Sequence, residues 1–221
     1  MNRINKLSIY LSNTQVFNAI DTDGVQNAYS GSAVPENEAM IIPELAGIFV
    51  LLGEKANIVT RFLKFGTFKR VEINFQLSPS NRILVEANKL SNILTIGGPA
   101  YNNATKYFQF ETTTGDTELV GKTKLYFWGD CIKNRRDKIN AFLVKASLDY
   151  DYGILEKIED GGRTVIVAAG FHVNGTRGSV KYLLDNWRKL QDSNFVLVIK
   201  FPHPSKDLEG YKKPLEIKRV T

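Results

Sequence analysis

The chain has 221 residues, a formal net charge of +6 and a composition that is 43% hydrophobic, 11% aromatic and 24% charged. These proportions are ordinary for a globular protein and argue against long disordered regions. The basic excess favours anionic partners such as nucleotides, nucleic acid or acidic proteins.

Length and cysteine usage restrict the class of protein further. A chain of this length builds one substantial core, so we predict a single domain over residues 1–221. The apolar run near the amino end is interrupted by Ser8 and Ser12 and is too short for a signal-peptide core or a membrane span. Cys131 is the only cysteine, which excludes an intrachain disulfide and favours a cytoplasmic location. Because no apolar run is long enough to span a membrane, we expect no membrane partner.

The first half of the chain predicts strands and helices separated by long connections. Residues 6–12 are apolar with aromatic and branched members and predict a strand, and the turn-rich segment 13–35 predicts a long loop. Helical spacing of apolar residues predicts a helix within 35–53. Alternation of apolar and polar residues over 69–77 predicts a half-buried strand, and 81–90 predicts a short helix.

The second half contains compact apolar runs. Residues 92–98 end in two glycines and predict a buried strand, and two further strands are predicted on either side of a turn at 160–162. An apolar stripe predicts a helix over 177–190. Residues 195–201 predict another buried strand, and the tail from Pro202 predicts an edge strand.

Strands that alternate with helices predict an α/β fold. We expect a Rossmann-like or flavodoxin-like architecture with a mixed, largely parallel sheet. The aromatic and threonine-rich segment 107–135 is interrupted by tight turns, and it predicts a β-rich insertion of antiparallel strands at the edge of the sheet or over a pocket.

A glycine-rich loop follows each of two predicted buried strands, where ligands collect in open α/β sheets. The first loop is IGGPAYN at residues 96–102. Gly97 and Gly98 would let a ligand approach the backbone, and Asn102 would cap the next helix and offer a polar contact. Free amides at a helix start favour an anion.

The second loop is AAGFHVNGT at residues 168–176. A phosphate or carboxylate there would accept hydrogen bonds from the Gly175 amide, the Thr176 hydroxyl and the Arg177 guanidinium. His172 would bind the same anion or move a proton. We predict that the two loops together form one ligand site.

Structural explanations of the same residues stay open. The two glycines of the first loop are also expected where a strand ends and a helix packs closely. Asn102 and Thr176 are ordinary helix-capping residues. His172 and Arg177 are also residue types that occupy exposed positions without a ligand.

No motif in the sequence identifies a reaction. GxSxG, HExxH and Walker sequences are absent. His172 and His203 lie far apart in the sequence, and with a single cysteine they give little support for a zinc site or any other metal site. The cofactors and the catalytic residues are unknown, with His172 as the one catalytic candidate. Carboxylates that could serve an enzyme cannot be paired from the sequence, namely Glu44, Glu111, Asp130 and Asp151.

Two stretches, NILTIGGPAYNNATKYF and DYGILEKIEDGGRTVIVAAGFHVNGTRGSVKYLL, resemble the C-terminal region of archaeal S-layer proteins and related uncharacterised prokaryotic domains. In that pattern one strand ends in Gly-Gly-Pro with an asparagine three residues on, and another ends in Ala-Gly before Thr-Arg and an amphipathic helix. The matching residues are Gly97, Gly98, Pro99, Asn102, Gly170, Thr176 and Arg177. The resemblance implies an α/β architecture between about residues 90 and 190 and does not by itself imply a function.

We therefore expect a cytoplasmic binding or sensor domain for an anionic small molecule that carries phosphate, with a nucleotide as the first candidate. One alternative is an enzyme that cleaves a nucleotide or glycosidic bond, with His172 or a loop carboxylate as acid or base. Another is a structural or interaction domain in which Tyr126, Phe127 and Trp128 dock a partner. Nucleic-acid binding has support from charge but from no motif, and homo-oligomer formation stays open.

Overall fold

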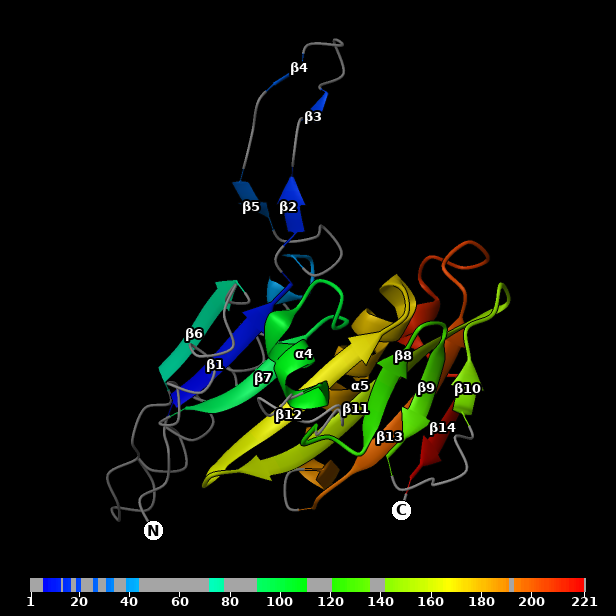
Figure 1. Ribbon diagram of the computed structural model, residues 1–221. Coiled ribbons are helices and arrows are strands. Elements are labelled where there is room, and N and C mark those ends of the chain that lie inside the picture. Colours follow the sequence, from blue (N-terminus) through cyan, green and yellow to red (C-terminus); the bar gives the residue numbers. More distant parts are fainter. Residues whose placement is uncertain are drawn as a thin grey trace, which may run out of the picture.

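The computed structural model describes residues 6–12, 14–16, 19–20, 26–27, 31–33, 39–43, 72–77, 91–110, 121–135, 142–190 and 193–220. These residues contain a seven-stranded sheet with the order β14-β13-β11-β12-β7-β1-β6 (Figure 1). Four neighbouring strands are parallel: β6 (Glu72–Leu77), β1 (Lys6–Leu11), β7 (Asn92–Ile96) and β12 (Arg163–Gly170).

The other half of the sheet is antiparallel. Strand β11 (Tyr150–Asp160) forms a hairpin with β12, and its turn contains Gly161 and Gly162 at φ values of 60° and 88°. Strand β13 (Val196–Pro202) pairs with β11, and the edge strand β14 (Glu216–Arg219) pairs with β13. Because β11 runs against both neighbours, its first residues lie beside the last residues of β12 and β13.

Each face of this sheet carries its own apolar core. Helix α5 (Val173–Leu190) covers one face, and helix α4 (Asn103–Gln109) covers the other together with a three-stranded sheet (Figure 1). That second sheet consists of β8 (Leu125–Trp128), β9 (Cys131–Asn134) and β10 (Phe142–Lys145). Neither of these two described helices is long and apolar enough to cross a membrane.

The alternation of side chains in β12 explains the two cores. Val165 and Val167 point to the face that α4 and β8 cover, whereas Ile166 and Ala168 point to α5. All four side chains are buried, as expected for a central strand covered on both faces. The sheet is therefore the middle layer of three.

Two short antiparallel ribbons complete the described strands. Strands β2 (Thr14–Val16) and β5 (Gly31–Ala33) form one pair, and β3 (Ala19–Ile20) and β4 (Gln26–Asn27) form the other. Figure 1 shows both ribbons standing away from the main sheet beyond β1. A short 3-10 helix, η1 (Gly210–Lys212), precedes β14.

The predicted Rossmann-like or flavodoxin-like class is wrong. In the part of the chain that the structure describes, strand residues outnumber helical ones, the main sheet is mixed, and helices do not alternate regularly with its strands. Among the described residues, only α5 crosses between two strands of that sheet that run in the same direction, β12 and β13. Helix α4 instead leads into the three-stranded sheet, which takes the position that a second layer of helices would occupy.

Individual elements were predicted better than the class. Strands at 6–12, 69–77, 92–98 and 195–201 are confirmed, as is the edge strand in the tail. Helix α5 begins at Val173, four residues before the predicted start. The predicted short helix at 81–90 lies outside the described residues, and so does the helix predicted within 35–53 apart from residues 39–43.

Paired glycines let α5 begin in contact with the sheet. Gly153 of β11 and Gly170 of β12 are register partners. A Cβ atom on Gly153 would meet the Ser179 Oγ at 2.1 Å and the Gly175 carbonyl oxygen at 2.3 Å. A Cβ on Gly170 would meet the backbone nitrogen of Thr176 at 2.3 Å. Any side chain at either position would therefore push the first turns of α5 off the strands.

We expect Gly170→Ala to lower the free energy of unfolding by about 2–4 kcal/mol, because the added methyl group meets backbone atoms that cannot rotate away. Urea denaturation measures this change. Gly98→Ala is the matched control, since a Cβ there would lie 3.4 Å from its nearest neighbour, the Gly170 carbonyl oxygen. Equal loss of stability in both variants would contradict this account of the helix–sheet contact.

A buried carboxylate joins the two sheets. Glu156 of β11 is only 1% exposed, and its two oxygens accept hydrogen bonds from the backbone amides of Lys124 and Leu125 at 2.6 and 3.0 Å. Burial raises the pKa of Glu156 to about 7, and these two amides together with the charges of Lys124 and Arg135 offset only part of the burial effect. The native state therefore holds this proton more tightly than the unfolded chain does.

This shift predicts a pH dependence of stability. The contribution of Glu156 is fully present below the ordinary pKa of 4.5 and is lost as the pH rises towards about 7. The wild-type unfolding free energy should fall through this window relative to that of Glu156→Gln, by at most about 1.4 kcal/mol per pH unit. Thermal or urea unfolding of both proteins across the window checks this, and parallel pH profiles would refute it.

Candidate functional site

The two glycine-rich loops lie next to each other at one end of the main sheet. They follow β7 and β12, which are parallel neighbours with Ile96 opposite Ala168. The Gly97 amide donates to the Ala168 carbonyl oxygen at 3.0 Å, and Gly98 lies against the Gly170 carbonyl. The predicted meeting of the two loops is therefore present. We call this end of the sheet, with the start of β11 and the end of β13, the strand-end site.

In the first loop, all hydrogen-bonding atoms of the Asn102 side chain are occupied. Its Oδ1 accepts from the amides of Ala104 and Thr105, both at 3.0 Å, and so caps α4. Its Nδ2 donates to the carbonyl oxygens of Tyr10 and Ile96 at 3.0 and 2.7 Å. Asn102 is fully buried and closes the gap between the ends of β1 and β7. Asn102 therefore caps α4 and links the ends of β1 and β7 by hydrogen bonds, and its buried side chain is not an exposed ligand contact.

In the second loop, a carboxylate of the protein itself occupies the start of α5. Asp151 of β11 accepts from the Gly175 amide at 2.6 Å and from the His172 amide at 3.1 Å. A negative charge at a helix N-terminus is favourable, and this is the position predicted for a bound phosphate. The Gly175 amide is consequently already bonded within the chain.

Asp151 is fully buried, which raises its pKa, although the Gly175 amide and the charge of His172 act in the opposite direction. The carboxylate cannot contact a ligand directly. Its role at the strand-end site is to hold the first turn of α5, and with it the His172 backbone, against the start of β11.

Thr176 and Arg177 also have partners inside the chain. Thr176 is buried, and its amide makes the first helical hydrogen bond, to the His172 carbonyl oxygen at 3.1 Å. The Arg177 guanidinium lies 3.9 Å from the centroid of the Tyr211 ring and donates to the Tyr211 hydroxyl at 2.8 Å. Arg177 thereby connects α5 to η1, and we assign the Arg177 side chain a packing role.

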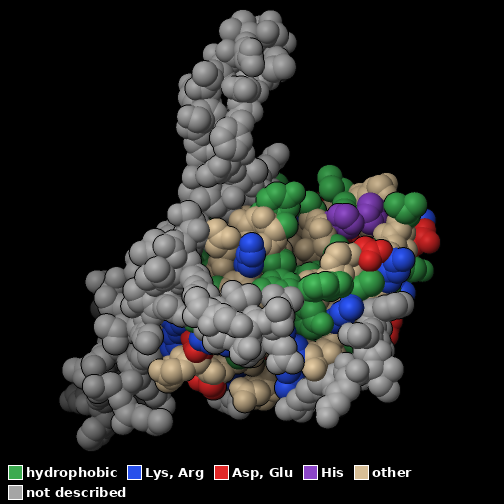
Figure 2. Space-filling view, in the orientation of Figure 1, with side chains coloured by type: hydrophobic (Ala, Val, Ile, Leu, Met, Phe, Trp, Pro, Cys, Tyr) green, Lys and Arg blue, Asp and Glu red, His purple; other side chains and the backbone are tan. Residues whose placement is uncertain are grey.

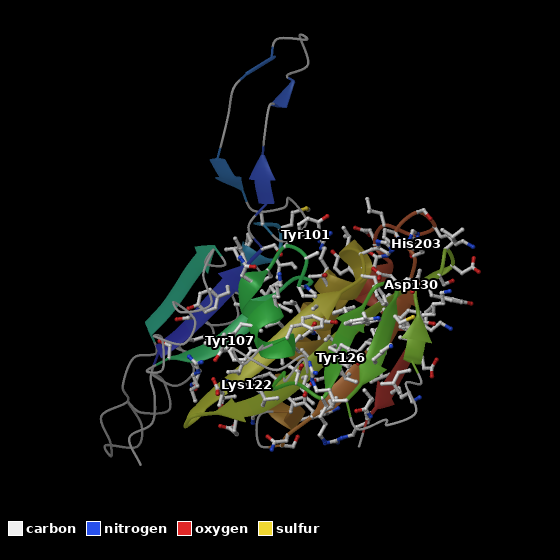
Figure 3. All side chains as sticks on the ribbon, viewed as in Figure 1. Tyr101, Tyr107, Lys122, Tyr126, Asp130 and His203 are labelled. Atoms are coloured by element: carbon white, nitrogen blue, oxygen red, sulfur yellow. The ribbon has the colours of Figure 1, made fainter. Side chains whose placement is uncertain are left out.

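Among the predicted site residues, the side chain of His172 is exposed, and it has a histidine neighbour. The rings of His172 and His203 have centroids 4.8 Å apart and cross at 76°. Figure 2 shows the two imidazoles together on the surface, and Figure 3 places His203 at the end of the main sheet. We call these two residues the histidine pair.

Hydrogen bonds hold His203 in place beside His172. Asn174, in the first turn of α5, donates from Nδ2 to the carbonyl oxygens of Pro202 and Asp207, on either side of His203. The His203 amide donates to the Asp149 carbonyl at 3.0 Å, and its Nδ1 accepts from the Ser205 amide at 3.2 Å. This last bond leaves the proton of a neutral His203 ring on Nε2, which makes that nitrogen a donor.

The imidazoles of the histidine pair can bind an anion or act as acid and base. Charged groups surround it, because Lys206 forms an ion pair with Asp149 and Asp151 lies beneath His172. Among the described residues, no group of three or more histidine, cysteine, aspartate and glutamate side chains could hold a metal ion.

Sequence reasoning missed the partners of His172. His203 follows β13 directly and His172 stands two residues after β12, and α5 connects these two strands, which run in the same direction. A crossover connection places the carboxyl ends of both strands at the same end of a sheet. This rule could have predicted from the sequence that His172 and His203 lie close together. The position of Asp151 beside the His172 loop could not be predicted in this way, because it depends on the antiparallel direction of β11.

The aromatic segment proposed as a docking surface is divided between two faces. Tyr126 and Trp128 point outward from β8, and Trp128 is 51% exposed. Phe127 points inward and stacks edge-to-face on Phe171 with ring centroids 4.9 Å apart. The inner residue thereby supports the loop that carries His172.

No protein-family model, curated protein or solved structure matches the chain. The likeness to the C-terminal region of archaeal S-layer proteins stays a prediction.

We expect Asn102→Ala to lower the free energy of unfolding by about 2–4 kcal/mol, since it removes a helix cap and leaves two buried carbonyl groups without their donor. Urea denaturation measures this loss. The neighbouring Tyr101→Ala is the control, because the Tyr101 side chain is 62% exposed. A change below about 0.5 kcal/mol in Asn102→Ala would show that the strand ends do not depend on this side chain.

Proposed function

We propose that the chain binds a small molecule carrying a phosphate or another anionic group, in the first instance a nucleotide, at the strand-end site. The contacts in this proposal are the side chains of the histidine pair rather than the amides of a helix start. The supporting observation is the pair of imidazoles at the ends of two strands, 4.8 Å apart between ring centroids, with His172 exposed and His203 half-buried. A cytoplasmic location is part of the proposal, since the chain has a single cysteine.

The surroundings favour side-chain recognition. Asp151 occupies the amides of Gly175 and His172, and Asn102 caps α4, so the predicted backbone cradles already have acceptors. An imidazole donates a hydrogen bond when neutral and adds a full positive charge when protonated. Two of them can hold one anionic group.

Cleavage of a bound nucleotide or glycosidic bond is the second candidate function. The observation that favours it is again the histidine pair, because one imidazole can act as the base while the other acts as the acid. Asp151 would then be a positioning residue, since it is buried and bonded to the His172 backbone.

The test is native mass spectrometry of the protein with a pool of nucleotides and dinucleotides, followed by calorimetry with any compound that binds. His172→Ala and His203→Ala should each weaken binding about tenfold, because each removes a side chain that contacts the anion. Loss of compound from the pool would identify the enzyme.

Lys181→Ala is the control variant. It removes a cation from α5 that is paired with Asp185 and does not line the strand-end site. The proposal fails if no compound binds at millimolar concentration, or if Lys181→Ala weakens binding as much as the histidine variants do.

A further inference from the structure

A cleft of about 350 Å³ lies at the opposite end of the main sheet from the histidine pair. The segment just before β8 forms one side of it, and residues of β11, β13 and β14 with their immediate neighbours form the rest. Figure 3 shows Lys122 and His203 at opposite ends of the structure. Pockets for small ligands begin at about 300 Å³, so the cleft fits a small molecule.

Basic side chains dominate the charge of the cleft. They come from three segments that are distant in the sequence, namely Lys122 and Lys124 before β8, Lys157 on β11 and Arg219 on β14. Two carboxylates, Glu156 and Glu159, also line it. The charged lining residues therefore number four basic and two acidic.

Existing contacts neutralise part of this charge. Lys122 donates to Asp160 Oδ1 at 2.9 Å, and this ion pair neutralises the charge of Lys122. Glu159 accepts from the Thr164 hydroxyl at 3.1 Å. Arg219 donates from one terminal nitrogen to the Asn194 carbonyl oxygen, which orients the guanidinium and leaves further N–H groups on its fork. Lys157 has a further contact within the chain, so Lys124 and Arg219 are the cations best placed to receive an anion.

The floor of the cleft is rigid because Glu156 accepts from the backbone amides of Lys124 and Leu125. These bonds hold the chain that carries the Lys124 side chain against β11. Apolar side chains complete the lining, namely Ile158, Val196 and Val220. The cleft thus combines basic side chains with an apolar wall.

We propose that this cleft binds a small molecule through a phosphate group, with Lys124 and Arg219 as its cationic contacts. The proposal is independent of the strand-end site, which shares no lining residue with the cleft. A partly protonated Glu156 supports it, since burial raises the pKa of this carboxyl to about 7 against the charges of Lys124 and Arg135. The neutral form repels a phosphate less than the carboxylate does.

The test is a titration followed by amide chemical shifts, with inorganic phosphate and phenyl phosphate as the two probes at constant ionic strength. The amides of Lys124, Leu125, Glu156 and Arg219 should shift with either probe. Arg219→Ala should weaken binding about tenfold, as expected for loss of a charge-assisted hydrogen bond. Equal affinity for the two probes indicates free phosphate, and tighter binding of phenyl phosphate indicates a monoester that contacts the apolar wall.

Lys218→Ala is the matched control. Lys218 precedes Arg219 in the exposed strand β14, and it does not line the cleft. Equal weakening by both variants would show a general effect of surface charge and overturn the proposal, as would the absence of shifts at the cleft amides.

A second variant should strengthen phosphate binding to the cleft instead of weakening it. Glu156→Gln removes the negative charge at the floor, so phosphate should bind more tightly to it than to the wild type at about pH 8. Arg219→Ala should leave any shifts at the His172 and His203 amides unchanged, which separates the cleft from the strand-end site. Unchanged or weaker phosphate binding to a folded Glu156→Gln protein would contradict the proposed position of the anion.

Discussion

The close approach of α5 to the backbone of β11 and β12 is the constraint on which the rest of the strand-end site depends. Glycine at positions 153, 170 and 175 removes the side chains that would hold the helix away. At this short separation Asp151 reaches two amides of the first turn, and a buried carboxylate is tolerated because these amides hydrogen-bond to it. Helix capping therefore comes from a neighbouring strand rather than from the residue before the helix.

This capping determines which groups remain for a ligand. A free helix start attracts phosphate because its amides have no other acceptor. Here Asp151 and Asn102 are the acceptors for these amides. The groups that remain for a ligand at the strand-end site are therefore the side chains of the histidine pair. The glycines that suggested a phosphate cradle serve mainly to bring backbone segments together.

The sequence predicted local structure well because periodicity reports burial directly. Strand β12 and helix α5 followed from apolar patterns, and Asn102 followed from its position before a helix. The fold class could not be obtained in this way, since apolar strands look alike whether a helix or a second sheet covers them. The capping role of Asp151 was equally hidden, because it arises from the direction of β11 and not from neighbouring residues.

The antiparallel direction of β11 also relates the two proposed sites. Its start carries Asp151 to the histidine pair, and its far half carries Glu156 to the basic cleft. In both places backbone amides of another segment bind the carboxylate and reduce its repulsion of an incoming anion. Through these two buried acids the strand holds the backbone segments that carry His172 and Lys124, so each proposed anion site contains a carboxylate that is already hydrogen-bonded.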